Sequence, residues 1–170
     1  MKVRIAESRD LPALVDIYNQ SIMHKRTAAL RPVTLVDREA WFTEHASSQY
    51  PILIAEKDGD ITGYLFFSAY RAGRDALRFT AEVSYFVDFK HHRQGIASRL
   101  MEAALDMCDH LKIKNLFAIL LENNTASIGL LKKYGFEQWA YLPSIAEIDG
   151  REFGQFYYGK RIVKGMKEVI

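Results

Sequence analysis

A basic loop between a strand-like segment and a helix-like segment is the strongest chemical signal in this chain of 170 residues. Residues 83–89 are mostly apolar, Lys90-His91-His92-Arg93 adds cationic side chains, and a helical pattern begins near Gly95. Backbone N–H groups at a helix N-terminus, with cations beside them, can bind a diphosphate. A glycine at such a turn lets the ligand approach the backbone closely. The loop therefore predicts a diphosphate site, although many α/β proteins carry a similar turn that binds no phosphate.

One carboxylate, Glu82, lies on the expected strand just before this loop. Strand alternation puts Glu82 on the same face as Phe86. A carboxylate on a central strand is unusual unless it is paired or functional. It could take a proton from an amine, or it could form an ion pair with the arginines that precede the strand. Those arginines could instead bind a substrate carboxylate or face solvent; they are Arg71, Arg74 and Arg78.

The overall composition narrows the class of protein. The shares of 49% hydrophobic and 26% charged residues are typical of a globular protein, and residues 1–170 are expected to form one domain. The net charge of +2 gives no strong attraction to nucleic acid or to an anionic membrane, so neither partner is expected. The single cysteine, Cys108, lies in a helical apolar pattern that predicts a buried thiol. No histidine spacing supports a metal site, no apolar run is long enough to cross a bilayer, and a cytoplasmic location is expected.

Hydrophobic periodicity predicts a three-layer α/β fold, with a mixed, mostly antiparallel sheet of about seven strands and helices on both faces. Strands are expected at residues 3–6, 51–56, 61–70, 77–87, 115–121, 136–145 and 153–162, and helices at 11–22, 38–45, 95–111 and 124–133. The continuous apolar run at 115–121 is typical of a strand that is buried on both sides. Asn124 or Thr125 can cap the last helix, and Gly135 can end it.

Two spaced motifs make the chain resemble the GNAT N-acetyltransferases. The segment His92-Arg93-Gln94-Gly95-Ile96-Ala97 is similar to the acyl-CoA loop of that family, Gln/Arg-x-x-Gly-x-Gly/Ala, with His92 at its first position. Residues 124–136 resemble the family's Asn-x-x-Ser-x-x-Leu-Tyr-x-Lys-x-Gly-Phe motif. Three further segments are similar to the phosphinothricin and methionine-sulfone acetyltransferase branch: Ile17-Tyr18-Asn19, residues 41–45 and residues 71–82.

The resemblance implies an enzyme that transfers an acetyl group from acetyl-CoA by direct attack of a small, amino-acid-like amine. Glu82 would be the catalytic base, and Arg71, Arg74 and Tyr18 would bind the substrate. Residues 85–87 would offer backbone groups to the pantetheine arm where pairing between the fourth and fifth strands is broken. The residues expected at the acetyl-CoA site are Tyr85, Phe86, Val87, His92, Arg93, Gln94, Gly95, Ile96, Ala97, Ser98, Asn124 and Ser127. No metal is expected.

Two positions depart from the family pattern. Leu131 stands where the branch usually has Tyr or His, and in GNAT enzymes that Tyr often protonates the departing thiolate. The source of this proton is therefore open. Residues 150–155 lack the acidic residue of the branch's Gly-x-Trp-x-Asp segment, so the identity of the amine is open too. The sequence leaves two alternative functions, a protein or peptide N-terminal acetyltransferase and a non-catalytic acyl-CoA-binding sensor domain. It also leaves open whether the chain forms a homodimer.

Overall fold

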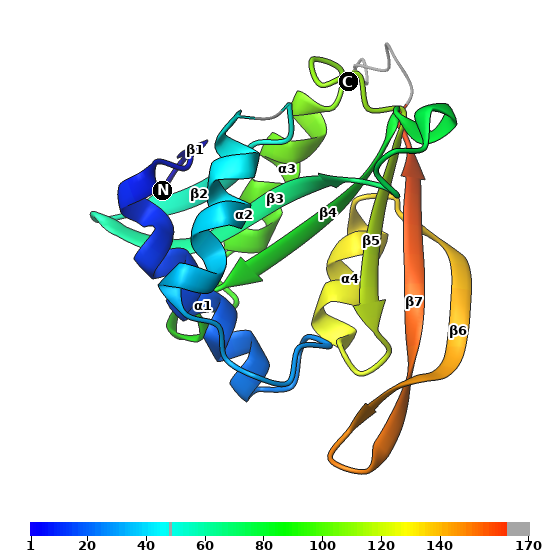
Figure 1. Ribbon diagram of the computed structural model, residues 1–170. Helices are drawn as coiled ribbons and strands as arrows, with labels where there is room; N and C mark the ends of the chain where they lie inside the picture. The colour runs from blue at the N-terminus through cyan, green and yellow to red at the C-terminus, as the bar shows by residue number, and fades with distance from the viewer. Residues whose placement is uncertain (48, 163–170) are drawn as a thin grey trace.

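The computed structural model describes residues 1–47 and 49–162, which form a seven-stranded sheet with helices on both faces (Figure 1). The strands are β1 Lys2–Ile5, β2 Ile52–Lys57, β3 Asp60–Ala69, β4 Thr80–Val87, β5 Asn115–Leu121, β6 Glu137–Ile148 and β7 Arg151–Arg161. The helices are α1 Leu11–Met23, α2 Leu35–Ser47, α3 Ile96–Met107 and α4 Thr125–Lys133. The predicted three-layer fold and the predicted order of its elements are confirmed.

The sheet opens between β4 and β5. Its strand order is β1-β2-β3-β4-β5-β7-β6, and β4 and β5 form its parallel pair. Their pairing runs from Thr80 opposite Asn115 to Glu82 opposite Phe117 and then stops. Both strands continue beyond that point, and Figure 1 shows them diverging. The backbone of residues 83–87 therefore pairs with β3 on one edge. On the edge that faces β5 it has no strand partner among residues 1–47 and 49–162.

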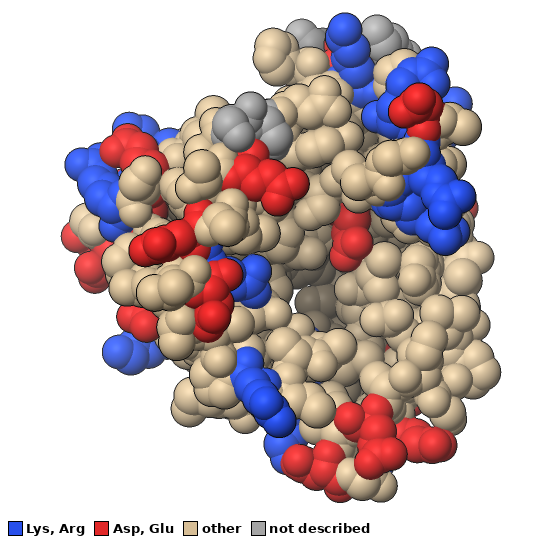
Figure 2. Space-filling view, viewed as in Figure 1, with Lys and Arg blue, Asp and Glu red and all other residues tan. Residues whose placement is uncertain are grey.

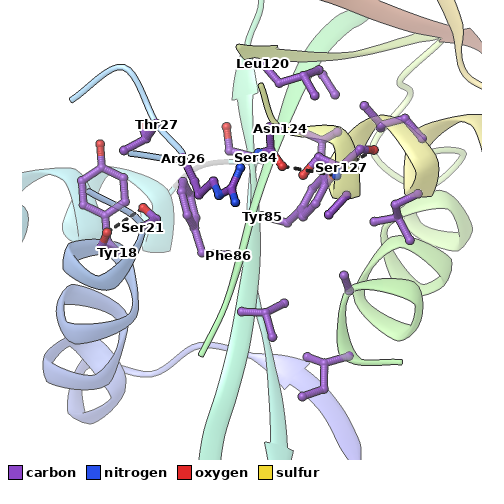
Figure 3. A pocket seen from close by; sticks show the side chains of 18 of the residues that line it. Tyr18, Ser21, Arg26, Thr27, Ser84, Tyr85, Phe86, Leu120, Asn124 and Ser127 are labelled. Atoms are coloured by element: carbon purple, nitrogen blue, oxygen red, sulfur yellow. Dashed lines mark hydrogen bonds between the residues drawn. The ribbon is translucent and has the colours of Figure 1, made fainter. Parts of the chain in front are cut away.

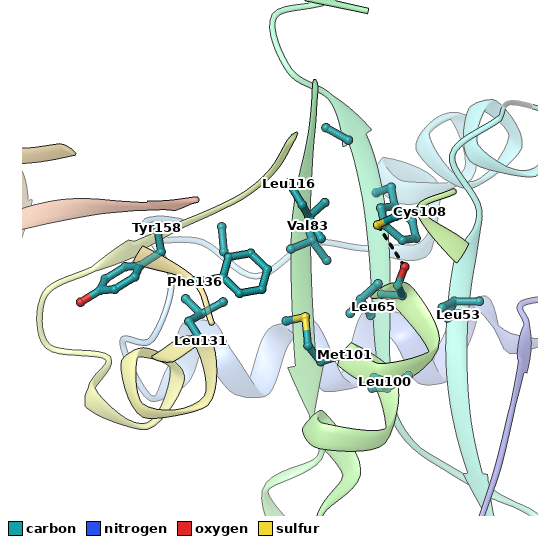
Figure 4. Close-up of a cluster of buried hydrophobic side chains, with 14 of the residues drawn as sticks. Leu53, Leu65, Val83, Leu100, Met101, Cys108, Leu116, Leu131, Phe136 and Tyr158 are labelled. Carbon is teal, nitrogen blue, oxygen red and sulfur yellow. Dashed lines mark hydrogen bonds between the residues drawn. The ribbon is translucent and has the colours of Figure 1, made fainter. Parts of the chain in front are cut away.

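Two apolar clusters hold the helices against the sheet. On one face, α1 and α2 pack against β2 and β3 through residues such as Leu14, Ile17 and Phe42. On the other face, α3 presents apolar residues at helical spacing, and Leu100 and Met101 lie fully buried against the sheet (Figure 4). Alternate residues of β3 and β4 belong to opposite clusters. The side chains on one face of β4 therefore face α1 and α2, and those on the other side face α3.

The structure corrects the expected start of β4. The sequence predicted a strand from residue 77, but Asp75–Leu77 forms a 3-10 turn and the strand begins at Thr80. The turn is stabilised by Arg78, whose Nη1 donates to the Asp75 carbonyl oxygen at 2.9 Å. The expected burial of Cys108 is confirmed, since its thiol is fully buried and burial raises its pKa to about 12. None of the helices in residues 1–47 and 49–162 is both long and apolar enough to span a membrane.

Candidate active site

A cavity of about 660 Å³ opens where β4 and β5 diverge. Its walls include residues 82–87 of β4 and residues 118–121 of β5, which are the parts of the two strands beyond their last pair. Residues from α1 and α2 line it on one side of the sheet, and residues from α3 and α4 line it on the other. Figure 2 shows the corresponding hollow in this face of the molecule. Its volume is in the range of sites that hold small molecules and cofactors.

The loop that joins β4 to α3 has the geometry of an anion site. Asp88 begins it by accepting a hydrogen bond from the Lys90 backbone N–H at 2.8 Å. Arg93 has a φ of 62° and Gly95 a φ of 79°, so two left-handed residues precede the first turn of α3 at Ile96. Turns that contain left-handed residues can direct successive backbone N–H groups toward one concavity, and the first N–H groups of a helix lack acceptors within the helix. A Cβ built on Gly95 would meet no other described residue within 4 Å apart from its two neighbours in the chain, so the space in front of this turn is open.

Most of the other predicted loop residues line the cavity, but Gln94 does not. His92, Arg93, Gly95 and residues 96–98 all line the cavity. The His92 Nε2 lies 3.1 Å from the Val87 carbonyl oxygen, which ties the loop to the end of β4. Gln94 is not among the described lining residues; its Oε1 accepts a hydrogen bond from the Lys57 ammonium at 3.1 Å. The loop thus borders the cavity with residues 92, 93 and 95–98, while the Gln94 side chain bonds elsewhere.

Glu82 is a half-buried carboxylate in the cavity wall. Burial raises its pKa above the ordinary glutamate value, because a charged carboxylate is poorly solvated there. Within residues 1–47 and 49–162 no ion pair engages it, so the structural alternative of an ion pair with the preceding arginines is not observed. Arg71 and Arg74 are exposed in the connection between β3 and β4, and neither is among the described lining residues. The structure therefore does not bring these two arginines together with Glu82.

Two other arginines do line the cavity, and sequence reasoning missed both. The guanidinium of Arg38 lies over the rings of Tyr18 and Trp41, 4.3 Å and 5.1 Å from their centroids. Arg26 donates through Nη1 to the carbonyl oxygen of Asn123 at 3.0 Å. The only sequence signal for Arg38 was its spacing of three residues from Trp41 in a helix, which places the two side chains on one face. Tyr18, a predicted substrate residue, lies in the same wall.

Tyr85 and Phe86 point to opposite sides of β4. Phe86 meets the Tyr18 ring edge-on at a centroid distance of 5.0 Å, on the α1 side. The Tyr85 hydroxyl donates to the Ser127 carbonyl oxygen of α4 at 3.5 Å (Figure 3). Asn124 caps α4 by accepting from the Ser127 backbone N–H at 3.3 Å, so these two predicted cofactor residues lie beside Tyr85.

The chain belongs to the GNAT acetyltransferases: the Acetyltransferase (GNAT) family matches residues 11–136. It is therefore an N-acetyltransferase, and the predicted class of enzyme is confirmed. Within the described residues, no group of three or more His, Cys, Asp or Glu side chains could hold a metal ion.

Relatives cover nearly the whole chain. YwnH of Bacillus subtilis is 37% identical over 164 residues, which cover 95% of this chain and 99% of YwnH. The L-methionine sulfoximine/L-methionine sulfone acetyltransferase of Salmonella typhimurium is 32% identical over 154 residues, 89% of this chain and 88% of that enzyme. The structure of yncA from Salmonella typhimurium with its cofactor acetyl-CoA matches with a TM-score of 0.91 and 28% identity, over 97% of this chain and 95% of yncA. These similarities confirm the branch that the sequence predicted.

Proposed function

We propose that this N-acetyltransferase acetylates the amino group of a small, amino-acid-like compound, with acetyl-CoA as the acetyl donor. The observation that carries the proposal is Glu82, a half-buried carboxylate with no ion-pair partner among residues 1–47 and 49–162. It lies in a cavity that opens between β4 and β5 and reaches the loop before α3. The similarity to an acetyltransferase named for L-methionine sulfoximine and L-methionine sulfone supports an amino acid as the acceptor. The similar yncA structure, which contains acetyl-CoA, supports the donor.

The loop and the open edge of β4 suit two parts of the donor. The backbone N–H groups at the start of α3, with Arg93 beside them, suit the diphosphate of CoA. In the part of the chain that the structure describes, no strand pairs with the edge of residues 85–87 that faces β5. This edge can therefore pair with the amide groups of the pantetheine arm as a further strand would. A donor held in this way has its thioester in the cavity, between Glu82 and α4.

Glu82 prepares the amine for attack. An α-ammonium group with a pKa of about 8 is only about one-tenth neutral at pH 7, so a base that removes its proton raises the concentration of the nucleophile. The raised pKa of Glu82 makes its carboxylate a stronger base than an exposed glutamate. The neutral amine then attacks the thioester carbonyl carbon, and a backbone N–H near Phe86 or Val87 stabilises the oxyanion.

Arg38 is the cation that the cavity offers to the carboxylate of an amino-acid substrate. Its guanidinium is held over Tyr18 and Trp41, and within residues 1–47 and 49–162 no hydrogen bond or ion pair engages it. A guanidinium with free N–H donors can bind a carboxylate bidentately. The sequence suggested Arg71 and Arg74 for this contact, and both stay predictions. A comparison of Arg38→Ala with Arg74→Ala separates Arg74 from Arg38.

The loop after α1 favours a small acceptor over a polypeptide. Arg26 ties this loop to Asn123, and Lys25 forms an ion pair with Asp149 at the turn between β6 and β7. Thr27, next in the chain, lines the cavity. The loop thus joins the α1 side of the cavity to the β5–α4 side (Figure 1), and we infer that it hinders the entry of a polypeptide.

The test is thiol release from acetyl-CoA in the presence of different amines. The proposal expects release that depends on an added amino acid or amino-acid analogue, with mass spectrometry showing the acetylated product. Faster release with peptides that carry a free N-terminus would favour the peptide acetyltransferase. Binding of acetyl-CoA without amine-dependent release from any acceptor of either class would favour a non-catalytic sensor and overturn the proposal.

A further inference from the structure

We propose that the hydroxyl group of Tyr85 donates the proton that the CoA sulfur takes up when the thioester breaks. The inference rests on the proposed function, because it concerns the second half of the same acetyl transfer. It assigns to the side chain of Tyr85 a catalytic role beyond the backbone contact that the sequence suggested for this residue.

The first observation is the position of Tyr85 on its strand. The residue lies beyond the last β4–β5 pair, at Glu82 and Phe117, so it belongs to the part of β4 that borders the cavity. Its neighbours in the alternation, Val83 and Val87, pack with it toward the α3 side of the sheet. Tyr85 therefore enters the cavity on the face opposite to Glu82, where the thiol departs if the amine attacks from the Glu82 side.

The second observation is the contact of Tyr85 with α4. Its hydroxyl reaches the Ser127 carbonyl oxygen at 3.5 Å, at the long limit of a hydrogen bond. Ser127 and Leu131 are four residues apart and lie on the same side of the helix. Leu131 is fully buried and carries no proton donor (Figure 4). The phenol of Tyr85 therefore contacts α4 one helical turn from Leu131, whose hydrocarbon side chain cannot donate a proton.

Three other hydroxyl groups, those of Tyr134, Ser21 and Ser84, are less suited to the role. The Tyr134 hydroxyl donates to Glu102 Oε1 at 2.8 Å, and Tyr134 is not among the described residues that line the cavity. The Ser21 hydroxyl donates to the Tyr18 carbonyl oxygen at 2.6 Å, on the α1 side. Ser84 lies on the Glu82 face of β4 by alternation. Of these residues, only Tyr85 lines the cavity, lies on the α4 side of the sheet and has a hydroxyl group whose hydrogen bond is weak.

The step balances in atoms and charge. Glu82 first passes to solvent the proton that it took from the ammonium group. The neutral amine nitrogen then forms a bond to the acetyl carbon and gives up its second proton to Glu82, which returns it to solvent after the reaction. As the tetrahedral intermediate collapses, the C–S bond breaks and its electron pair stays on sulfur. The Tyr85 O–H passes its proton to that sulfur, which leaves as the CoA thiol, and the phenolate regains a proton from solvent through the open cavity.

Burial keeps the phenol of Tyr85 protonated. Its pKa is raised to about 12, chiefly because a phenolate would be poorly solvated, so the group keeps its proton at neutral pH. A thiolate formed in the same cavity suffers the same loss of solvation, which raises the pKa of the departing thiol and brings it toward that of the phenol.

The test compares wild-type protein with Tyr85→Phe and with Tyr134→Phe as the matched control. Wild-type protein must first release thiol when an amine is added; if it does so with no amine, the proposed function fails together with this inference. For Tyr85→Phe we expect kcat to fall about 10²-fold, with the Kd of acetyl-CoA by calorimetry little changed. Tyr134→Phe should keep the wild-type kcat.

A fluorinated tyrosine at position 85 supplies the readout that a structural role would not move. Ring fluorination lowers the pKa of the phenol and hardly changes its shape, so a general acid at this position should bring the high-pH fall of kcat to a lower pH. The fluorinated protein also serves if Tyr85→Phe does not fold. An active wild-type enzyme whose kcat is unchanged in Tyr85→Phe, or whose pH profile is unchanged by fluorination, would overturn the role of Tyr85 and leave the proposed function intact.

Discussion

Glu82 and Tyr85 lie on the same strand, β4, and point to opposite faces of the sheet. Phe86, which shares the Glu82 face, packs against Tyr18 of α1, whereas Tyr85 reaches Ser127 of α4. Both side chains border the cavity because β4 has lost its β5 partner beyond Glu82. In the proposed reaction the strand therefore separates the group that removes a proton from the group that returns one.

Gly95→Val should weaken the binding of acetyl-CoA by about tenfold or more. A residue with a Cβ pays about 1–2 kcal/mol for a left-handed conformation, and the new side chain would fill the open space in front of the loop. Calorimetric titration of acetyl-CoA measures the affinity. Gly73→Val is the matched control, because Gly73 has a φ of 80° and no atom within 4 Å of its added Cβ, but lies in the exposed β3–β4 connection.

The two glycine variants separate backbone strain from ligand contact. Both should lower the melting temperature, since both place a side chain at a positive φ. Only Gly95→Val should lower the affinity for acetyl-CoA. A folded Gly95→Val protein with wild-type affinity would show that the loop does not bind the diphosphate.

Arg38→Ala should raise KM for an amino-acid substrate by about tenfold and should have a smaller effect on the amide analogue of that substrate. The reason is that the amide lacks the carboxylate to which the guanidinium would bind bidentately. Initial rates with the two analogues measure the difference. Arg74→Ala is the comparison: a larger carboxylate-specific effect there than at Arg38 would support the sequence-based assignment and contradict ours.

The sequence predicted most accurately the features that depend on the local pattern of residues. The continuous apolar run at 115–121 gave the bounds of β5, and Asn124 caps α4 as expected. The conformation of Gly95 follows from its place before a helix in a tight turn. These features depend on neighbours in the chain, so the order of residues is enough to find them.

The site depends on contacts between distant segments, and sequence reasoning missed part of it for that reason. The contact of Tyr85 with Ser127 exists because β4 and β5 diverge and α4 packs beside the opening. Arg38 reaches the cavity because α2 packs on α1, which no motif reports. Arg71 and Arg74 resembled a family pattern, but the structure leaves them exposed outside the cavity. A single domain over residues 1–170, a cytoplasmic location and a homodimer stay predictions.

Arg4→Ala should destabilise the fold by about 3 kcal/mol, since it leaves a buried carboxylate without its partner. Arg4 donates to both oxygens of Asp10, at 2.7 Å and 3.0 Å, and Asp10 is only 4% exposed. Denaturant unfolding measures the loss. Arg9→Ala is the control, because its ion pair with Glu7 is exposed and should be worth less than about 1 kcal/mol. Equal losses in the two variants would contradict the importance of the buried pair.

The same pair predicts how stability depends on pH. Burial alone would raise the pKa of Asp10, but the hydrogen bonds from Arg4 and from the Glu7 backbone outweigh it and lower the pKa below the usual value. A depressed pKa in the folded state stabilises the protein above the unfolded pKa of about 3.9. The unfolding free energy should therefore fall as pH drops below that value, and it should fall less steeply in Arg4→Ala, which has already lost the stabilised carboxylate.

The pH dependence of kcat/KM in Glu82→Gln tests the central claim, that Glu82 is the base, most directly. Wild-type kcat/KM should rise with pH as Glu82 loses its proton, above the usual glutamate range because its pKa is raised. Glutamine keeps the shape of the side chain but cannot accept the proton, so kcat/KM should fall by roughly 10²–10⁴-fold near neutral pH. The loss should shrink at high pH, where the amine is already neutral. A Glu82→Gln enzyme with wild-type rates from about pH 6 to about pH 9 would contradict the assignment.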